Sequence, residues 1–303
     1  MRVGLDIGGT KIDAVAIDES GTPVETARLA TGFGEQAVLA NAAAAVERLH
    51  ELTGASFASI GVGIPGLVDP ASGHVRHAVN LGFDDLSFGR ELEALVGVTV
   101  TVENDVNAAA LGAYHLMGLT GPVAYLNLGT GLAAGLVLDG TLWRGARGFS
   151  GEIGHIPIDP LGDVCPCGQR GCVETVASGS AIARRWPSHH EYPAQALFQA
   201  ADAGDPEALR IREDLARGVA AAVRILVLTV DVESVVIGGG LSHVGLPLLN
   251  CVQGALRDWS ASSTFLASLG LADRIRLLPE GLAVAAAGAA MLGLPSAALR
   301  TPA

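Results

Sequence analysis

The stretch VGLDIGGTKIDAVAID, residues 3–18, joins two apolar strands through consecutive glycines. A strand that ends in glycines lets its backbone approach an anion closely, because glycine tolerates the positive φ angles that aim several N–H groups at one point. Thr10 adds a hydroxyl, and the carboxylate of Asp6 can hold Mg²⁺ through water. The stretch is not a Walker loop, since GxxxxGK[ST] occurs nowhere in the chain. It indicates either a phosphate-binding turn or an ordinary hairpin.

A second stretch, AYLNLGTGLAAGLVLD at residues 124–139, repeats this layout. Asp6 precedes Asp18 by twelve residues, and Asn127 precedes Asp139 by the same twelve. The matched register predicts an internal duplication, although hairpin geometry alone can produce such spacing. Two glycine loops of this kind can bind a polyphosphate from both sides.

The rest of the chain alternates between short apolar strands and helices. Helical spacing covers residues 35–52 and 206–230, and residues 98–105 form a strand that leads into a helix. A third glycine run, at 238–240, follows another apolar strand. It is either a tight connection or a place where a flat ligand approaches the backbone. Alternation of this kind predicts an α/β fold.

The length of 303 residues suits two domains, and no Pro- or Ser-rich linker divides the chain. We expect an N-terminal α/β domain at 1–117 and a C-terminal α/β domain, carrying the cysteine-rich loop, at 118–282. A C-terminal helix at about 283–303 should pack back on the first domain.

The formal net charge of −12 argues against nucleic acid as a partner, because a basic surface is needed to displace its counterions. The most apolar runs, residues 218–230 and 282–294, are shorter than the ~20 residues that span a bilayer. The first residues lack a signal-peptide layout. We therefore expect a cytoplasmic protein with no membrane segment.

A strand-to-helix junction carries the clearest candidate for a catalytic base. In ENDVNAAALG, residues 103–112, Asn104 and Asp105 stand where the strand becomes the helix. Side chains of this kind commonly cap a helix by accepting bonds from its free N–H groups. A carboxylate beside a phosphate site can also accept the proton of an attacking hydroxyl. The two roles are compatible.

Three of the four cysteines lie within eight residues, in CPCGQRGC. Cys165, Cys167 and Cys172 follow His155 by ten residues or more, and Cys3His is a ligand set typical of structural Zn²⁺ sites. A disulfide would leave an odd thiol, and the C-x-x-C spacing of a redox pair is absent. Reduced thiols in a cytosolic protein also favour zinc.

Polar residues near this loop are candidates for contacts to a sugar. Glu152 and Glu174 flank the zinc ligands, and a metal would hold their loop rigidly. Most glutamates are solvated surface charges, which is the alternative. Asn80 and Gly66 are weaker candidates, because Asn is common in turns.

Together these motifs resemble the ROK family, which includes bacterial glucokinases and N-acetylhexosamine kinases. The resemblance covers almost the whole chain, through DIGGTK, IPGLVD, ENDVNAAALG, LGTG, GEIGH, CPCGQRGC and VIGGG. The pairing of GEIGH with C-x-C-x4-C is the most specific part. One departure is GLAAG after Thr130, where many members have GIGGG. The helix-turn-helix segment of ROK repressors is not expected here, since only Met1 and Arg2 precede Val3.

The resemblance implies a two-lobed, actin-like ATPase fold with duplicated, ribonuclease H-like halves. It also implies roles for individual residues, with Asp105 as the catalytic base. The implied nucleotide contacts are Asp6, Gly8, Gly9, Thr10, Lys11, Gly129, Thr130, Gly131, Gly238, Gly239 and Gly240. The implied sugar contacts are Asn104, Glu152, His155 and Glu174. Asp105, Gly66 and Asn80 complete the set of candidate substrate contacts. The implied zinc ligands are His155, Cys165, Cys167 and Cys172, so His155 would serve two sites.

The predicted function is ATP-dependent phosphorylation of a hexose at its C6 hydroxyl, most simply glucose, with Mg²⁺ accompanying ATP and Zn²⁺ in a structural role. N-Acetylglucosamine, N-acetylmannosamine, fructose and allose remain alternative substrates, and polyphosphate remains an alternative donor. A sugar sensor without catalysis and an actin-like assembly module are the alternatives outside catalysis. The family suggests a homodimer or homotetramer.

Overall fold

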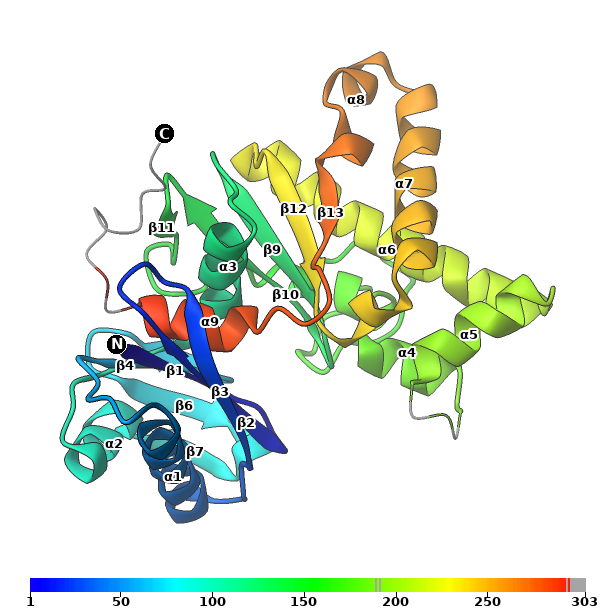
Figure 1. Ribbon diagram of the computed structural model, residues 1–303. Helices are drawn as coiled ribbons and strands as arrows, with labels where there is room; N and C mark the ends of the chain where they lie inside the picture. The colour runs from blue at the N-terminus through cyan, green and yellow to red at the C-terminus, as the bar shows by residue number, and fades with distance from the viewer. Residues whose placement is uncertain (189, 191, 293, 295–303) are drawn as a thin grey trace. The chain divides into compact units, whose positions relative to one another are not determined.

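The computed structural model describes residues 1–188, 190, 192–292 and 294, which form two compact units (Figure 1). Unit 1 comprises Met1–Thr120, Gly135–Ser150 and the described part of Gly281–Ala303. Unit 2 comprises Gly121–Ala134 and Gly151–Glu280. The domain limits expected from the sequence stay a prediction, and residues 293 and 295–303 of the expected C-terminal helix lie outside the described residues.

Unit 1 is built on a five-stranded sheet with the order β3-β2-β1-β4-β8. Strand β1 pairs antiparallel with β2 and parallel with β4, and β4 pairs parallel with β8. Alternate residues of β1, Val3, Leu5 and Ile7, are fully buried, which is why this strand lies at the centre of the sheet. The strands are β1 Arg2–Ile7, β2 Lys11–Ile17, β3 Pro23–Ala30, β4 Ile60–Ile64 and β8 Val100–Asn104.

The apolar run IGVGIPGLVD is divided between two sheets. Strand β4 ends at Ile64, and the chain then enters a separate three-stranded sheet of β5 (Leu67–Asp69), β6 (His74–Ala78) and β7 (Phe83–Leu86). Pro65 has no N–H to continue the ladder, and Gly66 takes a φ of 116° that other residues rarely adopt. The Pro65-Gly66 step is therefore the point where the chain changes sheets.

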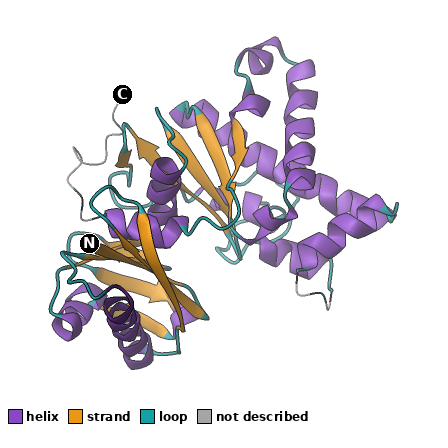
Figure 2. Cartoon of the chain, in the orientation of Figure 1, coloured by secondary structure: helices purple, strands orange, loops and turns teal. Residues whose placement is uncertain are grey.

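The α-helices among the described residues of unit 1 are α1 Glu35–Thr53, α2 Phe88–Val96, α3 Asp105–Leu116 and α9 Val284–Met291 (Figure 2). Helix α1 packs on β2 and β3 through a buried face that includes Val38, Leu39 and Leu49. Helix α9 packs on β1, β4 and α3. The short segment β11 (Thr141–Leu142) also groups with this unit.

Glycines allow α9 to lie in backbone contact with its neighbours. A Cβ added at Gly4 of β1 would lie 1.8 Å from the carbonyl oxygen of Ala286, and one at Gly61 of β4 would lie 1.7 Å from that of Ala289. Such separations are far inside van der Waals contact, so only glycine fits at these positions. The last described helix is thereby held directly against the central strands.

The second five-stranded sheet has the order β11-β10-β9-β12-β13. Its strands β9, β12 and β13 belong to unit 2. Both sheets place their strands in the order third, second, first, fourth, fifth along the chain, and β9, β12 and β13 run parallel just as β1, β4 and β8 do. The matching orders confirm the expected duplication. The remaining strands are β9 Val123–Leu128, β10 Leu132–Leu138, β12 Ser234–Gly238 and β13 Ile275–Leu277.

The helices of unit 2 follow the sequence patterns closely. The longest, α6, runs from Pro206 to Val230 as expected, with the Asp205 side chain accepting from two N–H groups at its start. The others are α4 Gly179–Arg185, α5 Pro193–Asp202, α7 Leu246–Ala261 and α8 Thr264–Ser268. Within the described part of the chain, no helix is both long and apolar enough to cross a bilayer.

Candidate active site

The turn between β1 and β2 is closed by its own backbone. The N–H of Gly8 donates to the carbonyl of Lys11 at 2.9 Å, and the Thr31 hydroxyl donates to the carbonyl of Gly8 at 2.6 Å. Gly9 and Thr10 are exposed at the tip. A Cβ on Gly9 would lie 3.7 Å from the carbonyl oxygen of Asn80, so the structure brings Asn80 to this turn.

The reason expected for the glycines of this turn is wrong at two positions. Neither Gly8 nor Gly9 has a positive φ. A positive φ is found in the third glycine run, where Gly239 takes a φ of 80°. At Gly9 the glycine instead leaves the tip without a side chain beside Asn80. The missing side chain leaves the backbone of the tip open to a ligand, and phosphate binding there stays a prediction.

A group of carboxylates lies beside this turn in unit 1. Asp6 and Asp13 are direct partners across β1 and β2. Burial, followed by the charges of Asp105 and Asp13, raises the pKa of Asp6 to about 7, with Lys11 acting in the opposite direction. Asp13 is itself paired with Lys11 at 3.3 Å and with Arg28. A nearby cation would favour the ionised form of this carboxylate, and that is the role expected for Mg²⁺ at Asp6.

The β8–α3 junction orients Asn104 and Asp105. The Asn104 side-chain oxygen accepts from the N–H groups of Val106 at 2.9 Å and Asn107 at 3.3 Å, which confirms the helix cap. Its amide nitrogen donates to the carbonyl of Gly66 at 3.4 Å. Asp105 begins α3 and accepts from the N–H of Val106 at 3.0 Å. Its charge is favoured at the N-terminus of the helix.

Sequence reasoning missed a buried ion pair at the same junction. Glu103 is only 2 % exposed, and it accepts from the guanidinium of Arg144 at 2.6 Å and from the side-chain amide of Asn107 at 3.0 Å. The sequence held one signal, because a charged residue follows the apolar run VTVTV at a buried strand position. The partner lies 41 residues away and carries no local pattern.

In unit 2 the loop between β9 and β10 is fastened to the start of α4. The N–H of Gly179 donates to the carbonyl of Gly129 at 2.8 Å, and Ser180 donates to the carbonyl of Thr130 through its N–H at 3.1 Å and its hydroxyl at 2.7 Å. A Cβ on Gly131 would lie 2.5 Å from a carboxylate oxygen of Glu174. The loop therefore has a fixed shape set by neighbours on both sides.

This loop forms one wall of a pocket of about 540 Å³, a volume typical of small-molecule sites. Gly129, Thr130 and Gly240 all line it, so the structure brings the second and third glycine runs together. Sequence reasoning missed the rest of the lining, which comes mainly from α4, α5 and the turn after β12. These residues are Gly179, Ser180, Ile182, Ala183, Tyr192, Pro193, Ala194, Gln195, Leu241, His243 and Val244.

The GEIGH segment lies against strand β10. A Cβ on Gly154 would fall 2.0 Å from the carbonyl oxygen of Leu132, so the strand is approached by bare backbone. Leu132 also donates its N–H to the carboxylate of Glu174 at 2.9 Å. Glu174 is half-buried, whereas Glu152 is exposed. The two glutamates thus differ: Glu174 ties the cysteine-rich segment to the glycine loop, and Glu152 faces solvent.

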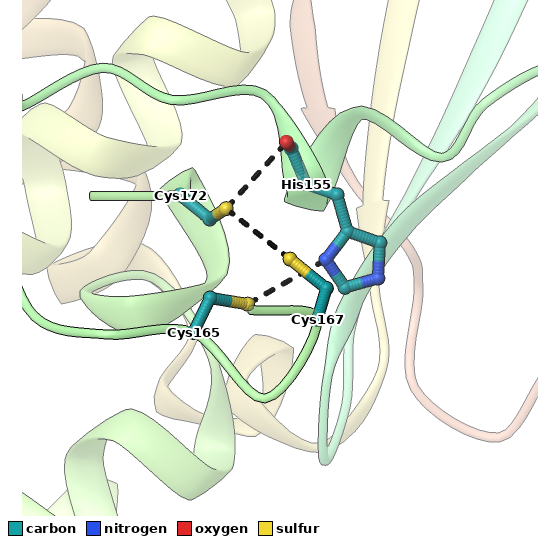
Figure 3. A group of neighbouring side chains, drawn as sticks. All are labelled: His155, Cys165, Cys167 and Cys172. Atoms are coloured by element: carbon teal, nitrogen blue, oxygen red, sulfur yellow. Dashed lines mark hydrogen bonds between the residues drawn. The ribbon is translucent and has the colours of Figure 1, made fainter. Parts of the chain in front are cut away.

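The four expected zinc ligands lie together in unit 2 (Figure 3). Their ligand atoms all lie within 4.8 Å of one another, with Cys165 Sγ 3.6 Å from His155 Nδ1 and Cys167 Sγ 3.8 Å from Cys172 Sγ. Zinc–sulfur bonds of ~2.3 Å in a tetrahedron place two sulfurs ~3.8 Å apart. All three thiols are free of disulfides. The cluster therefore fits a structural zinc ion.

The three thiols differ in acidity. Hydrogen bonds from the backbone and side chain of Gln169 lower the pKa of Cys167 to about 6. Burial raises the pKa of Cys165, and it raises that of Cys172 to about 12. Because zinc binds thiolates, loading the site at neutral pH would release protons from the two buried cysteines.

The predicted contacts divide between the two units. Asp6, Gly8, Gly9, Thr10, Lys11, Gly66, Asn80, Asn104 and Asp105 lie in unit 1. The second and third glycine runs, Glu152, Glu174 and the Cys3His cluster lie in unit 2.

Comparisons with known proteins give the chain its family. It is 34% identical over 275 residues to a glucokinase of Halalkalibacterium halodurans, covering 83% of each chain. Its fold matches the ROK hexokinase from Thermus thermophilus with a TM-score of 0.80, at 34% identity and 96% coverage of both chains. It also matches a ROK family glucokinase from Streptomyces griseus in complex with glucose and AMPPNP, with a TM-score of 0.78 at 32% identity, covering 96% of this chain and 98% of that one. The chain has the actin-like ATPase fold of its structural neighbours. Residues 2–292 match the ROK family, and the chain belongs to this family.

Proposed function

We propose that this protein transfers the γ-phosphoryl group of ATP to the C6 hydroxyl of a hexose, with glucose as the preferred substrate. The observation that carries the proposal is the β8–α3 junction, which holds Asp105 at the start of a helix, where its charge acts on Asp6. Similarity to glucokinases across most of the chain supports the choice of sugar.

In this proposal Asp105 is the general base. Its carboxylate accepts the proton of the C6 hydroxyl while that oxygen forms a bond to the γ-phosphorus, and the bond from phosphorus to the β-phosphate oxygen breaks to release ADP. A positioned base of this kind typically contributes ~10²–10⁴-fold in rate. Asn104, Gly66 and Asn80 are proposed to orient the sugar from unit 1.

The nucleotide is proposed to bind through both glycine turns and the pocket of unit 2. That pocket presents mostly apolar side chains, including Ile182, Leu241 and Val244, beside Thr130. Inorganic polyphosphate has no apolar part to fill such a pocket, whereas adenosine has. The lining therefore favours ATP as donor. Mg²⁺ bound near Asp6 would supply positive charge to the phosphates.

The zinc ion proposed for the Cys3His cluster has a structural role. The segment it cross-links has little regular structure, since its ladder contacts are the isolated bridges Pro157–Cys172 and Val164–Arg170. A closed four-ligand site would fix this segment and with it Glu174. Glu152, His155 and Glu174 are proposed to bind sugar hydroxyls from unit 2. A homodimer or homotetramer remains a prediction.

The test is a coupled kinase assay that crosses a panel of sugars with ATP and polyphosphate. Glucose with ATP should give the highest kcat/KM, and the panel should include N-acetylglucosamine, N-acetylmannosamine, fructose and allose. The Asp105→Asn variant should lose at least ~10²-fold in kcat while binding of glucose by calorimetry is retained. Near-normal turnover by this variant would refute the assignment of the base, and sugar binding without ATP consumption by the unmodified protein would refute a kinase.

A further inference from the structure

Glu103 is a buried carboxylate that the proposed reaction does not use directly. It stands at the end of β8 with a side chain 2 % exposed. One oxygen accepts from the N–H of Asn104 at 3.0 Å and from the side-chain amide of Asn107 at 3.0 Å. The other accepts from Nε of Arg144 at 2.6 Å. Three donors from the strand, the helix and a distant loop therefore converge on one carboxylate.

These contacts bracket the proposed base. Asn104 directly precedes Asp105, and Asn107 lies two residues after it on the first turn of α3. Asn107 is itself buried, at 7 % exposure, so its side chain has little freedom to move. Glu103 thus fixes the backbone before Asp105 and the helix after it. Rotation of the first turn of α3 would break at least one of these bonds.

Arg144 supplies the charge that makes this arrangement possible. A buried carboxylate is costly unless it is paired and fully hydrogen-bonded. Arg144 belongs to the segment Gly135–Ser150, which groups with unit 1, and its side chain is 36 % exposed. Its guanidinium therefore reaches inward from the surface to the carboxylate. Without it, Glu103 would have to take up water or leave its position, and the junction would shift with it.

We propose that Glu103 and Arg144 are positioning residues that hold Asp105 in place for phosphoryl transfer; this inference rests on the function proposed above. The pair touches neither substrate in this scheme and acts through the junction. Misplacement of a reacting group by about 1 Å can cost ~10²-fold in rate. The effect should therefore appear mainly in kcat.

The kinetic experiment compares Arg144→Met, Arg144→Lys, Glu103→Gln and the double variant Glu103→Gln/Arg144→Met. Arg144→Met should lower kcat by ~10–10²-fold and change the KM for ATP by less than about threefold. Arg144→Lys should recover part of the loss, since it restores the charge. In the Glu103→Gln background, Arg144→Met should lower kcat by less than about a further twofold, because the partner charge is already absent.

A matched control is Arg274→Met, which removes a partly exposed arginine paired with Asp231 at 2.9 Å in unit 2. This variant should keep kcat within about twofold. A kcat of Arg144→Met equal to that of the control, or losses that simply multiply in the double variant, would overturn the proposal.

A second measurement keeps this result separate from the proposed function. Hydrogen exchange by mass spectrometry should show faster exchange in Arg144→Met across residues 103–110, with exchange in unit 2 unchanged. Equal protection of these residues in both proteins would overturn the positioning role. If the unmodified protein phosphorylates no sugar, the kinase proposal fails, and the exchange data still decide whether the pair holds the junction.

Discussion

Replacing Asp6 by Asn should stabilise the folded protein, by an amount that depends on pH. Burial and the charges of Asp105 and Asp13 raise the pKa of Asp6 from 3.8 to about 7. Each pKa unit corresponds to ~1.4 kcal/mol, so the ionised carboxylate opposes folding by at most about 4 kcal/mol. Asn has nearly the same shape and removes this charge.

The stabilisation should grow with pH over a defined interval. Below pH 3.8 Asp6 is protonated in both states, and the raised pKa has no effect on stability. Between pH 3.8 and about 7 the unfolded chain loses the proton while the folded chain keeps it, so the native protein becomes less stable as pH rises. Above about pH 7 the difference is constant. The advantage of Asp6→Asn should therefore rise across this interval and then level off.

Urea unfolding of both proteins at intervals from about pH 4.5 to 8.5 measures the difference. Asp18→Asn is the control, because hydrogen bonds, first from Ser20, lower the pKa of exposed Asp18. Removing that carboxylate should destabilise the protein by an amount that stays constant over this range, because a lowered pKa makes the contribution depend on pH only below 3.8. A difference between Asp6→Asn and the native protein that stays flat across the whole range would refute the reasoning. Catalysis should fall in Asp6→Asn at every pH if the carboxylate holds Mg²⁺.

Two further predictions concern packing and metal binding. Gly61→Ala should cost at least about 3 kcal/mol, because its Cβ would lie 1.7 Å from the Ala289 carbonyl oxygen. Gly254→Ala on α7, with open space around its Cβ, should instead stabilise by ~0.5–1 kcal/mol; equal Tm shifts in thermal unfolding would contradict this account. Cys167→Ser should reduce zinc, measured by elemental analysis, well below the expected one ion per chain, and weaken sugar binding with it. Unchanged metal content would remove Cys167 from the ligand set.

Local patterns predicted much of the fold because strands, caps and turns depend on neighbouring residues. The matched spacing in residues 3–18 and 124–139 indicated the duplication that the two strand orders confirm. The limits of α6 followed from the helical spacing of residues 206–230. The cysteine spacing likewise identified the four side chains that gather in unit 2.

Contacts between distant segments could not be predicted in this way. Glu103 and Arg144 meet only because the fold brings β8 and the segment after β11 together. No pattern in the sequence indicated that Glu174, an expected sugar contact, also accepts from the N–H of Leu132. The small size required at Gly4 is explained by α9, near the other end of the described chain. Local patterns in a single sequence do not reveal which distant partner limits a residue's size or charge.

The seating of α9 on the central strands also constrains how the protein is made. Strand β1 leaves the ribosome early, but the groove above Gly4 is filled by Ala286, which is synthesised after all of unit 2. During translation the face of the unit 1 sheet that α9 covers therefore stays exposed, while the intervening segments acquire their own structure. Long-range closure of this kind is slow. Unit 1 is consequently completed only after the segments of unit 2 have been synthesised.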